Sequence, residues 1–116
     1  MDQKMIDRTA AEAILEQYAR HGWELRRVLL TGEASADIRE FFAGKDVRDA
    51  EIEALWFARR SRQGSETWEL RRLGGSPFAL VAVIEDGTGD DERESQLSAT
   101  EGQLSDVARR LGETGH

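Results

Sequence analysis

Three charged residues, Arg59, Glu69 and Arg71, are the side chains of this sequence best placed for chemistry. They fall in two neighbouring stretches that read as β-strands, at odd-numbered positions that share one face of a sheet. A carboxylate flanked by guanidinium groups is typical of a cross-strand ion pair, which is the simpler interpretation. The same trio can bind an anionic small molecule, so a small-molecule-binding protein or an enzyme using these residues stays open as the less favoured interpretation.

The histidine, serine and cysteine content of the sequence does not support nucleophilic catalysis. The two histidines are His21, at the end of a predicted helix, and His116, the last residue. The run of Gly75, Ser76 and Pro77 is better explained as a hairpin turn than as a nucleophile elbow. Cysteine is absent, which excludes a thiol nucleophile, thiolate zinc ligands and disulfides. We therefore expect no catalytic residue and a protein that is not an enzyme.

The acidic stretch 85–94 is the densest group of oxygen ligands. On the pattern of a calcium-binding loop, Asp86, Thr88 and Asp90 fill the first, third and fifth positions. The sixth position is not glycine, and the twelfth is Leu97 instead of a bidentate glutamate. We expect a solvated linker here, and no metal or cofactor in the protein.

Charge is distributed unevenly along the 116 residues, whose formal net charge is −7. Residues 1–84 carry 13 basic and 14 acidic side chains, whereas residues 85–116 carry 3 basic and 9 acidic ones. Tight binding to nucleic acid draws on clustered Lys and Arg, and an acidic tail repels phosphate. The balance of charge therefore predicts no nucleic-acid partner.

Hydropathy predicts a cytoplasmic protein without membrane contact. The longest apolar run covers residues 78–84, whereas a membrane helix needs about 20 apolar residues. Residues 1–11 contain no long apolar stretch of the kind that marks a secretory signal. The lack of cysteine fits a reducing compartment.

The stretch 52–84 predicts three consecutive antiparallel strands, over 52–60, 66–73 and 77–84, joined by glycine-containing turns. Symmetric turns place Trp56 opposite Leu70, and Leu70 opposite Leu80. One face then forms a core, which we expect the first helix to cover. Its members are Trp56, Ala58, Trp68, Leu70, Phe78, Leu80, Ala82 and Ile84.

The N-terminal half contains a helix, a strand and a shorter helix. A capping box from Thr9 to Glu12 opens the first helix, and Gly22 ends it. The strand over 23–30 places Trp23 and Leu25 on the same face as Leu29, with apolar side chains on both faces. A second helix covers 35–43, and the charged stretch 45–51 reads as a loop.

The order of elements, α-β-α-β-β-β-α, predicts a two-layer α+β fold on a mainly antiparallel sheet of about four strands. We expect a single domain over 1–84, followed by an acidic linker over 85–98. A second capping box, from Thr100 to Gln103, opens a short amphipathic helix over 99–112. Residues 113–116 are expected to be a disordered end.

One segment carries a resemblance. A helix over 10–21 runs into the Gly-Trp-Glu-Leu sequence of residues 22–25, and residues 55–60 read LWFARR. This resembles a widespread family of small bacterial domains of unknown function, in which such a helix and strand precede a second aromatic strand ending in basic residues. The resemblance covers 10–30 and 52–60 and departs in the insert 31–51 and after Gly64. It implies a helix-on-sheet arrangement and no catalytic residues.

The second face of the three strands is too apolar to be left in water as one patch. Its key members are Leu55, Phe57, Arg59, Glu69, Arg71, Leu73, Val81 and Val83. We expect a helix or another subunit to cover it. The sequence thus predicts a non-catalytic interaction domain that self-associates as a homodimer through this face, and the alternative is a small acidic chaperone or adaptor for a protein partner.

Overall fold

A computed structural model describes residues 7–61, 63–74 and 78–110. The elements follow one another as α1 (Arg8–Arg20), β1 (Glu24–Leu30), α2 (Ala36–Phe41), β2 (Val47–Asp49), β3 (Ala54–Arg60), β4 (Glu66–Arg72), β5 (Ala79–Ile84) and α3 (Asp90–Arg110). The α+β class predicted from the sequence is confirmed. Within the described residues, none of the helices has the length and apolar character needed to cross a bilayer.

The sheet has five strands in the order β2-β1-β3-β4-β5, not the four expected. The additional strand, β2, lies in the stretch 45–51 that was predicted to be a loop, and it pairs parallel to β1. Backbone bonds from Val28 N to Asp46 O (2.9 Å) and from Ala50 N to Leu30 O (3.0 Å) hold it there. Because all three β2 residues are exposed, no apolar alternation marks this edge strand.

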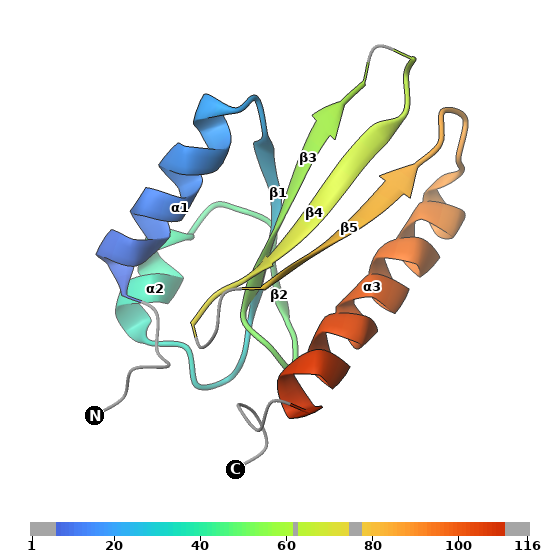
Figure 1. The fold of residues 1–116 in the computed structure, drawn as a ribbon. Helices are drawn as coiled ribbons and strands as arrows, with labels where there is room; N and C mark the ends of the chain where they lie inside the picture. The colour runs from blue at the N-terminus through green and yellow to red at the C-terminus, as the bar shows by residue number, and fades with distance from the viewer. Residues whose placement is uncertain (1–6, 62, 75–77, 111–116) are drawn as a thin grey trace.

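Helices cover both faces of the sheet, so the domain has three layers and not two (Figure 1). The turn-symmetric register was correct, with Trp56 opposite Leu70 and Leu70 opposite Leu80. The Trp-rich face is buried by α3, and the expectation that the first helix covers it is wrong. Leu97 and Leu104 of α3 are fully buried against it, each contributing about 1.5–3 kcal/mol of apolar transfer free energy.

The segment 85–98 is not a linker from Asp90 onward, because α3 begins there. Its acidic first turn is favoured by the positive end of the helix dipole. Acidic composition alone therefore does not distinguish this helix start from a linker. The predicted capping box at Thr100 is also wrong, since that hydroxyl donates to Gln96 O inside the helix at 3.0 Å. The expected disordered end, 113–116, lies outside the described residues.

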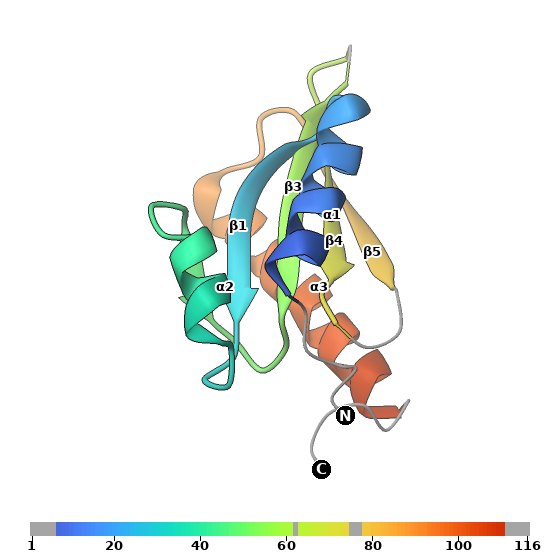
Figure 2. The ribbon, with the colours of Figure 1, turned by 90° about the vertical axis from the view of Figure 1, so that its left-hand side faces the viewer.

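The opposite face of the sheet packs against α1 and α2 (Figure 2). Its buried residues are Ala11, Val28, Leu30, Ile38, Phe42, Leu55, Phe57 and Leu73. Helix α1 is capped by Asp7, whose carboxylate accepts from Ala10 N at 2.8 Å, and not by Thr9. Gly22 follows α1 with a φ of +84°, which agrees with the expected end of this helix.

A bulge in β1 changes the faces predicted for that strand. The register against β3 shifts by one residue between Leu25 and Arg27. Leu25 therefore faces α1 together with Val28, whereas Leu29 faces α3. The expected grouping of Leu25 with Leu29 is wrong, although burial on both faces of β1 is confirmed by Val28 and Leu29.

Candidate functional site: the open face at β5

The predicted interaction face divides into a closed and an open part. Leu55, Phe57 and Leu73 are buried beneath α1 and α2, and another subunit is not needed to cover them. In contrast, Val81 and Val83 on β5 are 57% and 50% exposed. Figure 2 shows why, since α1 lies over β3 and β4, α2 lies on the side of β1, and neither helix covers β5.

We call the uncovered α1-side surface of β4 and β5 the open β5 face. It consists of Thr67, Glu69, Arg71, Ala79, Val81 and Val83. The register joins these residues in cross-strand pairs, with Glu69 opposite Val81 and Arg71 opposite Ala79. Charged side chains of β4 therefore lie beside apolar side chains of β5 on this face.

The outer edge of β5 has no partner strand among the described residues. Arg72 N donates to Phe78 O at 2.9 Å, which makes these two residues a hydrogen-bonded pair of the antiparallel ladder. Such pairs alternate along the strands, so even-numbered residues of β5 direct their backbone groups toward β4. The N–H and C=O groups of Ala79, Val81 and Val83 consequently point outward, at the free edge.

A pocket of about 510 Å³ lies where α1 meets β4 and β5. Its lining residues are Gln17, Tyr18, His21, Trp23, Glu69, Arg71, Phe78 and Ala79. Two of the charged residues expected from the sequence, Glu69 and Arg71, therefore do share a site. The pocket adjoins the open β5 face, because Glu69, Arg71 and Ala79 belong to both.

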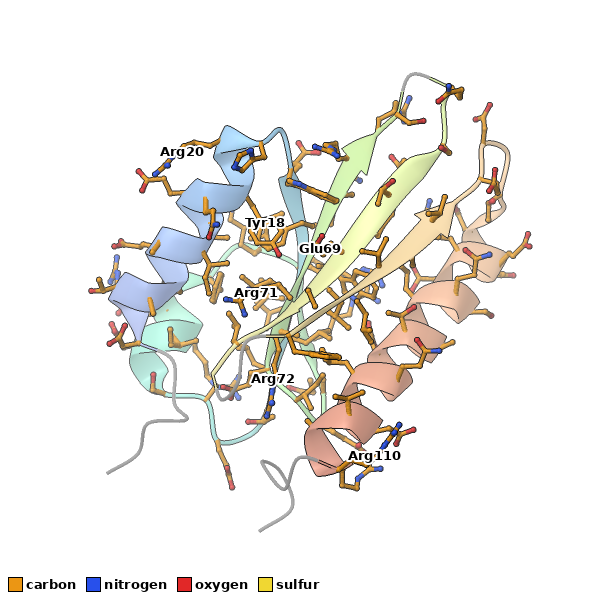
Figure 3. All side chains as sticks on the ribbon, in the orientation of Figure 1. Tyr18, Arg20, Glu69, Arg71, Arg72 and Arg110 are labelled. Carbon is orange, nitrogen blue, oxygen red and sulfur yellow. The ribbon has the colours of Figure 1, made fainter. Side chains whose placement is uncertain are left out.

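Tyr18 closes the pocket from the helix side. Its hydroxyl donates to Glu69 Oε2 (Figure 3). Its ring stacks on Phe57 with centroids 3.9 Å apart. Burial, followed by the hydrogen bond to the Glu69 carboxylate, raises the pKa of Tyr18 far above its ordinary value. The phenol therefore stays protonated and remains a hydrogen-bond donor across the physiological range.

Arg59 does not join Glu69 and Arg71. Its guanidinium carbon lies 4.7 Å from the centroid of the Trp23 ring, and Nη1 donates to His21 O at 3.1 Å. The expected three-residue cluster is thus wrong in one member. Tyr18 was missed as a site residue because its helical spacing identifies only the apolar face of α1, not the cross-sheet hydroxyl contact.

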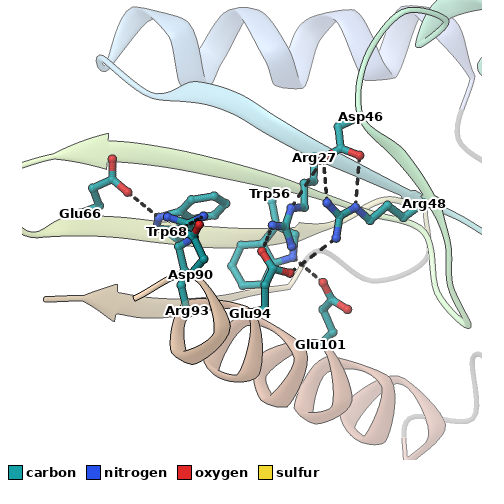
Figure 4. Close-up of polar contacts among 10 residues, drawn as sticks. All are labelled: Arg27, Asp46, Arg48, Trp56, Glu66, Trp68, Asp90, Arg93, Glu94 and Glu101. Atoms are coloured by element: carbon teal, nitrogen blue, oxygen red, sulfur yellow. Dashed lines mark hydrogen bonds and ion pairs between the residues drawn. The ribbon is translucent and has the colours of Figure 1, made fainter. Parts of the chain in front are cut away.

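A second polar cluster joins α3 to β1 and β2 (Figure 4). Arg27, which is 7% exposed, hydrogen bonds to Glu94, and Arg48 donates to both carboxylate oxygens of Asp46 at 3.1 Å. Trp56 Nε1 donates to Glu101 Oε2 at 2.8 Å in the same region. Its arginines pair with carboxylates of opposite charge, so we assign this cluster to the docking of α3.

Two carboxylates of this cluster, Glu94 and Asp46, are held in their charged form. The hydrogen bond from Arg27 lowers the pKa of Glu94, and the hydrogen bond from Arg48 lowers the pKa of Asp46. Both shifts stabilise the folded state at neutral pH, because each carboxylate is more easily ionised when folded than when unfolded.

Neither cluster has the composition of a metal centre. In the part of the chain that the structure describes, no three His, Asp or Glu side chains converge on a point that could hold an ion. The resemblance to small bacterial domains of unknown function stays a prediction that rests on the sequence motif alone. No family model matches this sequence, and no similar protein was found among curated proteins or among solved structures.

Proposed function

We propose that this protein is a non-catalytic interaction module that self-associates through the free edge of β5. The observation that carries the proposal is the unpaired outer edge of β5, judged on the described residues, bordered by the exposed Val81 and Val83. Free edges are usually protected by charge, proline or a covering segment. Residues 79–84 contain neither a charged residue nor a proline.

The occupant that this edge fits is a second copy of β5 in antiparallel orientation. The backbone groups that point outward from β5 belong to its odd-numbered residues. Hydrogen bonds between two copies related by a twofold axis must therefore join odd-numbered residues of one copy to odd-numbered residues of the other. With the axis at Ala82, Val81 lies opposite Val83 of the second copy, and Leu80 lies opposite Ile84. The two sheets would then join into one continuous sheet with apolar pairs on both faces.

Charge complementarity supports the antiparallel orientation. Arg71 lies beside Ala79 at the start of β5, and Glu85 and Asp86 directly follow its end. In the same register, Glu85 of the second copy lies opposite Ala79, one strand away from Arg71. A parallel arrangement would instead bring the acidic ends of the two strands together, which is unfavourable.

The mass of the protein in solution tests this proposal. We expect the wild type to sediment as a dimer at tens of micromolar, and Val81→Lys combined with Val83→Lys to sediment as a monomer, because charges at the edge oppose pairing. Both valines are exposed, so the substitutions should change monomer stability by no more than about 0.5 kcal/mol.

Val47→Lys is the matched control, since Val47 is 37% exposed on β2 at the other edge of the sheet. This variant should sediment as the wild type does. A wild type that is monomeric at these concentrations would contradict the proposal. A dimer that survives the two β5 substitutions but dissociates with Val47→Lys would place the interface at β2.

A further inference from the structure

We propose that the pocket between α1 and β4–β5 binds a small zwitterion, an aromatic α-amino acid, with Arg71 holding its carboxylate and Glu69 its ammonium group. This inference stands independently of self-association, because the pocket is lined by residues of a single chain. It rests on two opposite charges that face one pocket, on the contacts that orient them, and on the rings beside them.

The two charges are available to a ligand. Glu69 and Arg71 project from the same face of β4, two residues apart, yet no ion pair joins them within the described residues. Arg71 Nη1 donates to Arg72 O at 2.6 Å, which leaves Nη2 and Nε for a carboxylate. Glu69 accepts from Tyr18 through Oε2, which leaves Oε1 for an ammonium donor.

The Glu69 carboxylate is oriented before any ligand arrives. The Tyr18 ring is fixed by stacking on Phe57 and by an edge contact with Trp23, whose centroid lies 6.0 Å away. Arg59 in turn lies over the Trp23 ring. Because the hydroxyl that holds Glu69 sits on a fixed ring, little side-chain entropy remains to be lost on binding.

The size and lining of the pocket indicate which side chain the proposed amino acid carries. A volume of about 510 Å³ falls in the range of small-molecule sites, about 300–1,000 Å³. Tyr18 and Trp23 give it aromatic walls, against which an aromatic side chain packs. A ligand that carries only one charge would leave either Glu69 or Arg71 unmatched, which weakens its binding.

Three related probes test this assignment: L-phenylalanine, 3-phenylpropionate, which lacks the ammonium group, and phenethylamine, which lacks the carboxylate. Binding to the full chain is followed by amide and indole shifts in NMR titrations. We expect L-phenylalanine to bind at least about tenfold more tightly than either relative, since each relative leaves one charged group unpaired.

Arg71→Gln and Glu69→Gln keep the shape of the site and remove one charge each. Each should weaken L-phenylalanine binding at least about tenfold, and Arg71→Gln should leave phenethylamine binding unchanged. Arg20→Gln is the matched control, because Arg20 is exposed on α1 and pairs with Glu16 outside the pocket. This control should bind L-phenylalanine as the wild type does.

Two results would overturn the proposal. One is the lack of saturable L-phenylalanine binding to the folded wild type at millimolar concentration. The other is binding by apolar contact alone, which equal affinity for the three probes and unchanged affinity in both charge variants would each reveal. The dispersion of the NMR spectrum reports folding in every titration. Repeating the titration with Val83→Lys, which opposes pairing at the edge but lies opposite Thr67 and not opposite Glu69, separates this outcome from that of self-association.

Discussion

Tyr18 is the residue that ties α1 to the open part of the sheet. Its ring belongs to the core through Phe57, whereas its hydroxyl reaches Glu69 at the rim of the pocket. The sequence placed Glu69 and Arg71 on one face because strand alternation is a strict rule. It could not separate Arg59 from them, since the Trp23 ring that binds Arg59 comes from a segment more than thirty residues away.

Removing the Tyr18 hydroxyl should lower the stability of the protein markedly, although only one heavy atom is lost. We expect Tyr18→Phe to lower the free energy of unfolding by about 1.5–3 kcal/mol, because a hydrogen bond to a charged acceptor is lost while the ring stack remains. Urea denaturation measures the change. In a double-mutant cycle with Glu69→Gln, the two substitutions should be non-additive, and additive effects would contradict the contact.

At the scale of elements, α3 is the part of the fold that sequence reasoning described least well. The strands 52–84 were predictable with their register, because two short turns fix which residues face each other. The first half of α3 was not, because its exposed side chains are mostly polar and Leu97 is the one large apolar residue in that half. Strand β2 was missed for the same reason, since an exposed edge strand held by backbone bonds leaves no hydrophobic pattern.

The docking of α3 predicts a dependence of stability on pH. The pKa of Glu94 is lower in the folded state than in the unfolded chain, so its contribution is fully present above the ordinary glutamate value of about 4.3. That contribution is lost as the pH falls through the folded-state pKa. We expect the free energy of unfolding to decrease between about pH 5 and pH 3.

Glu94→Gln tests the origin of this dependence. The variant should be less stable than the wild type at pH 7 and should lose less stability on acidification, since Arg27 no longer has that carboxylate as a partner. Glu92→Gln is the control, because Glu92 is exposed in the same turn region of α3. Chemical denaturation at a series of pH values measures both, and parallel curves for the wild type and Glu94→Gln would contradict the assignment.

For the whole molecule, the three layers leave the two edges of the sheet for association, and β5 is the longer and more apolar of the two edge strands. Helices α1 and α2 bury one face of the sheet and α3 buries the other, so that the side of β5 and its outer edge stay open, as does the short edge strand β2 (Figure 1). The apolar face predicted for association is therefore covered in large part by helices of the same chain. Only Val81 and Val83, of its five apolar members, remain exposed.

Hydrogen exchange along β5 is the most direct measurement of the central claim, that this edge pairs with a second copy. The amides of Leu80, Ala82 and Ile84 face β4 and should be protected in both the monomer and the dimer. The amides of Val81 and Val83 should be protected at high protein concentration and exchange rapidly after dilution or in the variant that carries lysine at both positions. Rapid exchange at these two amides at every concentration, with their even-numbered neighbours protected, would contradict the account.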